Sequence, residues 1–148
     1  MHSFGEVLES PRPVMTFRVK TEWLAIPVEK VERVALAEKL LQMPCVRAEH
    51  LGLLLENGAL IPVLELGSKA TTVVPKEGWL VAILHVRGES VGLRIDAAGR
   101  ILHGWRATLR TGAPPAWLGD AAATTIVDTH EFCWLVDPDA LWRGFETP

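Results

Sequence analysis

The sequence predicts an all-β fold, arranged as one barrel or as a pair of small barrels. Several short segments alternate apolar and polar residues with the period of two that is typical of strands. Turn signals, of which Asn57-Gly58 is the strongest, separate these segments at close spacing. The chain has 148 residues, which is enough for one hydrophobic core or for two small cores that share an interface.

The N-terminal part of the chain predicts a β-hairpin. Apolar residues occupy the odd positions from Met15 to Val19 and alternate with polar ones, which indicates a strand with one face in water. Residues 24–28 repeat this pattern after a turn at Thr21-Glu22. The next residues, 31–41, fit the face of a helix, while the first four of them fit a short strand equally well. Periodicity does not decide between the two, and on the residues alone we favour the helix.

Another hairpin is predicted around Asn57-Gly58. Leu53–Glu56 and Ala59–Leu64 are the expected strands. Asn-Gly suits a two-residue turn because both of its positions need a positive φ angle. Pro62 cannot donate a hydrogen bond to a neighbouring strand, so we expect it at a sheet edge or at a bulge.

A further hairpin is predicted in the middle of the chain. Trp79–Val86 is a continuous apolar run that indicates a buried strand. The polar residues Arg87–Ser90 predict a turn, and the segment after them predicts the partner strand. On that strand we expect Val91, Leu93 and Ile95 to face inward.

The C-terminal third is expected to hold a loop, a last hairpin and a short helix. Gly112–Pro115 contains prolines that break helices and strand ladders, which predicts a loop. The polar residues Asp128–Glu131 lie between two apolar segments and predict a hairpin turn. Asp137 is expected to cap a closing helix over 138–142, because Asp is a favoured N-cap and proline suits the first turn.

Composition and charge exclude several classes of protein. The net charge is −3 and no stripe of Lys and Arg is present, so we expect no nucleic-acid partner. Apolar runs stay well short of the ~18 residues that cross a bilayer, so we expect no insertion into a membrane. Residues 1–10 lack the basic start and long apolar stretch of a secretory signal, which predicts a cytoplasmic protein. Cys45 and Cys133 are far apart in apolar surroundings and are expected to be reduced and buried.

We expect no catalytic residue, metal or cofactor. The five histidines are scattered and form no closely spaced pair of metal ligands: His2, His50, His85, His103 and His130. No glycine-rich phosphate loop and no exposed nucleophile turn is recognisable. The six tryptophans are expected mainly in the core. A small β protein without catalytic groups is most often a binding or scaffolding module.

Four segments of the chain, taken in order, match the motifs of one known family. Residues 52–66 match a strand, an Arg-Gly turn and a strand that ends in Pro-Val-Ile-Asp-Leu. Residues 23–34 match Tyr-Ala-Ile followed by Val-x-Glu-Ile, and Met43-Pro44 matches the next proline. Residues 91–96 match Val-Gly-Leu-Val-Val-Asp, and residues 135–141 match a terminal Leu-Asp-x-x-x-Leu. The sequence therefore resembles the CheW-like domain of bacterial chemosensory systems.

This resemblance implies a more specific fold than the strand pattern does. CheW-like domains consist of two small SH3-like β-barrel subdomains that pack through a shared apolar interface, here with a short C-terminal helix. The resemblance implies a tight turn over 28–31 and a strand over 32–36, in place of a helix. The expected domain covers residues 14–143, with interleaved subdomains, and leaves tails at 1–13 and 144–148.

The resemblance also implies a function. Stand-alone CheW-like proteins are non-catalytic adaptors that hold a CheA-type histidine kinase against the cytoplasmic tip of chemoreceptors. In this family the receptor tip is a helical hairpin that lies in the groove between the barrels, and the kinase regulatory domain contacts the barrel ends. We therefore expect these two partners, and a cytoplasmic location with recruitment to receptor arrays.

Five positions match those that contact partners in the family: Val31, Arg33, Gly52, Asn57 and Gly58. The chain departs from the family pattern at two of them. Asn57 stands where the family has the turn arginine, and Arg33 stands where it has the glutamate of Val-x-Glu-Ile. Arginine offers a planar fork for carboxylates that asparagine lacks, although asparagine is the better residue for the turn itself.

These departures leave alternatives open. Either the receptor contact is rebuilt elsewhere, or the protein serves a different partner. A divergent CheW-like protein with an output other than chemotaxis, such as surface motility or second-messenger control, is the nearest alternative. A β-barrel protein that binds a small molecule in an apolar cleft between the barrels is an alternative from another class.

Overall fold

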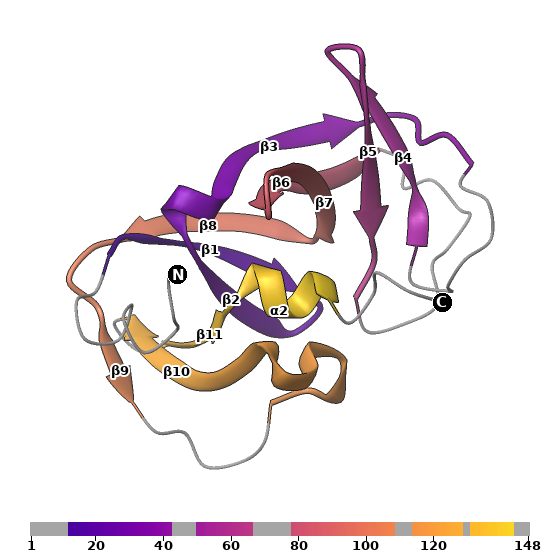
Figure 1. Ribbon diagram of the computed structural model, residues 1–148. Helices are drawn as coiled ribbons and strands as arrows, with labels where there is room; N and C mark the ends of the chain where they lie inside the picture. The colour runs from indigo at the N-terminus through magenta and orange to yellow at the C-terminus, as the bar shows by residue number, and fades with distance from the viewer. Residues whose placement is uncertain (1–11, 43–49, 67–77, 109–113, 129–130, 144–148) are drawn as a thin grey trace.

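The computed structural model describes residues 12–42, 50–66, 78–108, 114–128 and 131–143, and it consists mainly of strands (Figure 1). The strands are β1 (Val14–Val19), β2 (Glu22–Pro27), β3 (Val31–Ala37), β4 (His50–Glu56), β5 (Ala59–Leu64), β6 (Trp79–Val86), β7 (Glu89–Ile95), β8 (Ala97–Leu102), β9 (Arg106–Thr108), β10 (Ala122–Asp128) and β11 (Glu131–Val136). The helical elements are η1 (Val28–Lys30), η2 (Ala116–Ala121) and α2 (Pro138–Arg143). In the described part of the chain no helix is long and apolar enough to span a membrane.

The strands form two curled sheets, which we call barrel A and barrel B. Barrel A has six strands in the order β8-β1-β2-β11-β10-β9, and barrel B has five in the order β3-β6-β7-β5-β4. The chain begins in barrel A, builds barrel B and then returns to complete barrel A. The two edges of barrel B meet where Leu41, after β3, exchanges backbone hydrogen bonds of 2.8 and 2.9 Å with Leu53 of β4. The predicted mainly β fold with two barrels and a short C-terminal helix is confirmed.

Three apolar cores stabilise this arrangement. The core of barrel A consists of Val14, Ala25, Leu102, Trp105, Ile126, Cys133 and Leu135. The core of barrel B consists of Ala37, Leu54, Ile61, Val63, Trp79, Val81 and Ile83. The third core, which we call the shared core, joins β1, β2 and β11 of barrel A to β6 and β7 of barrel B, with η2 and α2 packed against them.

Three of the strands that build the shared core, β2, β6 and β11, are apolar on both faces. In β6, Ala82 and Leu84 contribute to the shared core, while Val81 and Ile83 contribute to the core of barrel B. Neighbouring residues of a strand point to opposite faces, so each face of β6 meets a different core. β2 and β11 divide their side chains in the same way between the shared core and barrel A. This is why Trp79–Val86 is an unbroken apolar run.

The segment after β2 is a strand, so the helix favoured over 31–41 is wrong and the strand implied by the resemblance is correct. The 3-10 turn Val28–Lys30 leads directly into β3. β3 then pairs antiparallel with β6 from Val31 to Ala37. Pairing with a distant strand outweighs the weak helical periodicity, and local sequence does not contain that information.

The polar face of the first strand is only partly in water, which corrects the prediction. Phe17 and Val19 enter the shared core and Arg18 is exposed, as expected, but Thr16, on the same face as Arg18, is 3% exposed. Its Oγ1 accepts a hydrogen bond of 3.0 Å from the backbone N of Arg100 in β8. Gly99 makes this close approach feasible, because a Cβ there would lie 2.1 Å from Thr16 Oγ1. β8, which covers this face, has no clear signal in the sequence.

Pro62 is not in an edge strand, because β5 lies between β7 and β4. Its partner Leu53 directs its backbone N–H and C=O to Leu41, so the two residues form a pair without mutual hydrogen bonds. The backbone N of Pro62 therefore faces β7. Since β5 pairs with β7 only from Val63 onward, no ladder hydrogen bond depends on the missing N–H.

All four predicted hairpins are present, as β1–β2, β4–β5, β6–β7 and β10–β11. The β6–β7 turn is shorter than expected, because Glu89 and Ser90 already belong to β7. As predicted, α2 begins at Pro138, and Asp137 Oδ1 accepts a hydrogen bond of 3.0 Å from the backbone N of Asp139. The expected hairpin turn at 129–130 lies outside the described residues.

Other predictions concern single side chains. Cys133 is buried and free, as expected, whereas Cys45 and Met43-Pro44 lie outside the described residues. Three tryptophans are buried: Trp79, Trp105 and Trp134. The other three, which are Trp23, Trp117 and Trp142, are half-buried and pack against the cores. The tryptophans therefore serve the core, as predicted.

We predict that Gly92→Ala destabilises the protein. A Cβ at this position of β7 would come within 2.9 Å of Val63 Cγ2 and Val81 Cγ1 in barrel B. Overpacking of this kind costs about 1–3 kcal/mol, which urea or thermal unfolding would measure. Ala98→Val on the exposed strand β8 is the control, with an expected change below about 0.5 kcal/mol. Wild-type stability of Gly92→Ala would contradict its placement inside the barrel.

Candidate partner-binding surface

One end of barrel B gathers most of the residues that the sequence assigns to partner binding. β5 and β7 run parallel, and β3 and β4 run antiparallel to β6 and β5. The start of β3 and the turns of the β4–β5 and β6–β7 hairpins therefore lie at the same end of the sheet. Both turns have positive φ angles, of 51° and 79° at Asn57-Gly58 and of 49° and 81° at Arg87-Gly88. This confirms the turn predicted at Asn57-Gly58.

An ion pair crosses the opening between β3 and β4 at this end. The guanidinium of Arg33 donates a hydrogen bond to the carboxylate of Glu56. Arg33 and Glu56 lie on the same strand faces as Ala35 and Leu54, which pack in barrel B. The pair thus covers the end of that core. The hydrogen bond to Glu56 also raises the pKa of Arg33, so this side chain stays charged.

Glu32, between two of the predicted site residues, is held by side chains from two other strands. Ser90 Oγ of β7 donates a hydrogen bond of 2.6 Å to Glu32 Oε1, and His85 Nδ1 of β6 lies 3.1 Å from the same oxygen. The hydrogen bonds from Ser90 and His85 lower the pKa of Glu32, because they favour the charged carboxylate. In the sequence, His85 is one of five scattered histidines, and no pattern distinguishes Glu32.

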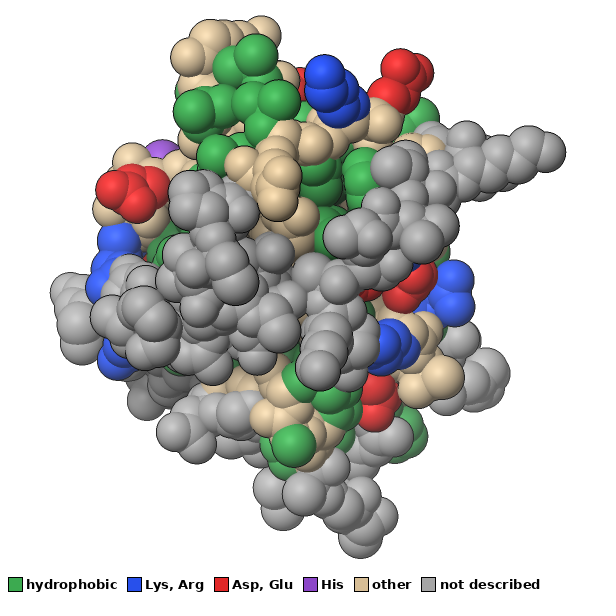
Figure 2. Space-filling model, turned by 90° about the vertical axis from the view of Figure 1, so that its right-hand side faces the viewer, with side chains coloured by type: hydrophobic (Ala, Val, Ile, Leu, Met, Phe, Trp, Pro, Cys, Tyr) green, Lys and Arg blue, Asp and Glu red, His purple; other side chains and the backbone are tan. Residues whose placement is uncertain are grey.

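The outer face of the β4–β5 hairpin carries an exposed apolar cluster, which we call the leucine patch. It consists of Leu41, Leu53, Leu55, Leu60 and Pro62. These residues form two cross-strand rows, since Leu55 pairs with Leu60, and Leu53 pairs with both Pro62 and Leu41. Leu55 is 60% exposed and Leu60 is 55% exposed. Figure 2 shows hydrophobic side chains at the top of one face, over this hairpin, with basic and acidic side chains beside them.

The structure separates the five predicted site residues into different environments. Arg33, Asn57 and Gly58 come together at the end of barrel B, because Arg33 contacts the residue before Asn57. Val31 is half-buried and packs against the shared core. Gly52 is buried, and a Cβ there would lie 2.9 Å from the backbone O of Leu41. Gly52 therefore permits the closure of barrel B.

The leucine patch is the feature that sequence reasoning missed. Residues 53–55 are three leucines in a row, and the alternation of a strand puts the outer two on the face opposite Leu54. A strand of a single barrel needs only one apolar face, so apolar residues on both faces signal a second contact. The leucines that give this signal, Leu53 and Leu55, lie in one of the strands predicted around Asn57-Gly58.

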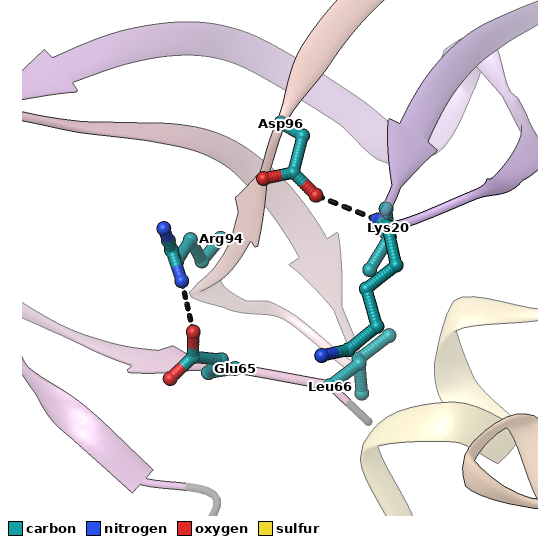
Figure 3. Close-up of a pocket in the computed structure, with 6 residues that line it drawn as sticks. Lys20, Glu65, Leu66, Arg94 and Asp96 are labelled. Carbon is teal, nitrogen blue, oxygen red and sulfur yellow. Dashed lines mark hydrogen bonds and ion pairs between the residues drawn. The ribbon is translucent and has the colours of Figure 1, made fainter. Parts of the chain in front are cut away.

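The cavities in the described part of the chain offer little room for a small molecule. A cavity of about 60 Å³ lies where the β1–β2 turn meets the ends of β5 and β7 (Figure 3). Arg94 donates a hydrogen bond to the buried Glu65, and the backbone N of Lys20 donates one of 2.6 Å to Asp96. A larger cavity of about 210 Å³ is lined by Val86, Arg87, Glu89 and Trp142. Small-molecule sites usually measure about 300–1,000 Å³, so neither of these two cavities favours the small-molecule alternative. In the described residues, no group of three or more His, Cys, Asp and Glu side chains could hold a metal ion.

Comparison with known proteins gives a matching family and a similar solved structure. Residues 13–146 match the CheW-like domain. Among solved structures, the chain is similar to the scaffolding protein TtCheW from Thermoanaerobacter tengcongensis, with a TM-score of 0.68, 13% identity, and coverage of 86% of this chain and 89% of that one. None of the curated proteins matches the sequence. The likeness to TtCheW confirms the predicted pair of SH3-like barrels. The family match covers nearly the whole chain, and the chain therefore belongs to the CheW-like domain family, a family of chemosensory scaffold proteins.

Proposed function

We propose that this protein is a non-catalytic adaptor that couples chemoreceptors to a CheA-type histidine kinase in the cytoplasm. The observation that carries the proposal is the leucine patch beside the Arg33–Glu56 ion pair, on a chain of the CheW-like family. An exposed apolar cluster with charged residues at its rim is typical of a protein interaction site. Residues 14–143 form the proposed adaptor domain.

Two surfaces are available for two partners. The leucine patch lies on the outer face of the β4–β5 hairpin, and we place the regulatory domain of the kinase there. Val31 and Val34 pack against the shared core and are only half-buried, so an apolar edge is accessible near the junction of the barrels. We place the helical hairpin of the receptor tip there, next to β3. This mechanism requires no catalysis, because the adaptor acts by binding both partners and stabilising them in one assembly.

The proposal predicts that the purified protein recovers both partners from its native cytoplasm. A pull-down with the protein as bait should yield a CheA-type kinase together with a chemoreceptor. Each should then bind separately, as purified kinase regulatory domain and purified receptor tip, with dissociation constants measurable by calorimetry. Recovery of neither partner would contradict the adaptor function while leaving the fold intact.

We predict that Leu60→Glu weakens binding of the kinase regulatory domain at least about tenfold, because a charge in the centre of an apolar interface must be desolvated without a partner. The variant should fold normally, since Leu60 is 55% exposed. Ile101→Glu is the matched control, because Ile101 is 49% exposed on β8 of barrel A. Equal binding by Leu60→Glu and Ile101→Glu would exclude the leucine patch as the kinase site.

The divergent-output alternative is tested at Asn57. Arg87 has nearly the same φ angle in the β6–β7 turn, so the turn geometry accepts arginine, and Asn57→Arg should fold. If the protein serves a partner matched to its own residues, this variant binds that partner no better than the wild type does. An increase in affinity for the native receptor tip would instead indicate that Asn57 is a local variation on an ordinary receptor site.

A further inference from the structure

The backbone of β3 contains a β-bulge at Glu32. The register between β3 and β6 shifts between Val31 and Arg33, which leaves Glu32 without a partner residue in the ladder. Bulges are over-represented at sheet edges, which include β3, and next to functional sites, where the extra residue redirects a side chain. Here the redirected side chain is a carboxylate at the exposed start of β3.

The redirected carboxylate has a fixed position. Ser90 and His85 hold Glu32 from β7 and β6, at 2.6 and 3.1 Å. Both contacts are made to Oε1, and Oε2 makes no hydrogen bond to any residue that the structure describes. A carboxylate that is positioned before binding loses little side-chain entropy when a partner arrives.

The charges around Glu32 favour a cationic ligand. Arg33 on the same strand is engaged by Glu56 of β4. The three side chains of Glu32, Arg33 and Glu56 therefore carry one net negative charge together. Complementary charges at an interface determine which partners bind.

We propose that Glu32 is a specificity-determining residue, which pairs with a Lys or Arg side chain on a helix of the receptor tip. This inference rests on the proposed function. Val31, directly before Glu32, packs at the accessible edge of the shared core. A receptor helix seated against this edge places its flanking side chains beside the bulge. The apolar contact supplies affinity, and the contact with Glu32 selects helices with a basic residue at that position.

The test uses the full-length protein and the purified receptor tip from the same genome. Glu32→Gln should weaken binding about tenfold and should reduce the salt dependence of binding, because it removes one interfacial charge pair. Glu38→Gln is the control, since Glu38 is an exposed carboxylate just after β3. Thermal unfolding verifies that both variants fold.

The outcomes separate this inference from the proposed function. A wild-type protein that binds the receptor tip, together with a Glu32→Gln variant that binds equally well, would overturn the role of Glu32 alone. A wild-type protein that does not bind the receptor tip would overturn the proposed function as well. Tenfold weaker binding by Glu32→Gln, with unchanged binding by Glu38→Gln, is the result that we expect.

Discussion

The structure depends on the burial of apolar side chains between two barrels. β2, β6 and β11 each contribute alternate residues to the shared core and to the core of their own barrel. Neither barrel can separate without exposing one face of these strands to water, which the hydrophobic effect opposes. The shared core therefore fixes the barrels relative to each other. Any partner that contacts the junction meets a rigid surface.

The end of barrel B combines two kinds of interaction in a small area. In the proposed function, apolar residues of the leucine patch provide contact area for a partner, and charged residues at its rim provide selection. The ion pair between Arg33 and Glu56 also covers the core of barrel B, so the proposed recognition site and part of the barrel's stability share one position. Mutation of either residue consequently requires a measurement of folding beside any measurement of binding.

The two departures from the family pattern occur at one place in the structure. Arg33 contacts Glu56, which directly precedes Asn57, so the chain retains an opposite-charge pair next to the turn while its basic residue lies on β3. Turn geometry by itself does not explain Asn57, because Arg87 occupies the equivalent position of the other hairpin with a similar φ angle. The arrangement of charge thus distinguishes this protein from the pattern of its family.

Local patterns in the sequence determined the strands of four hairpins, the turn at Asn57-Gly58 and the cap at Asp137, because each depends on neighbouring residues. The motif match also predicted the family and the strand β3. Tertiary structure alone decided the burial of Thr16 under β8, the bulge at Glu32 and the pairing of Arg33 with Glu56. These features join residues that are distant in sequence. They depend on strand register and barrel closure, and no local pattern encodes either one.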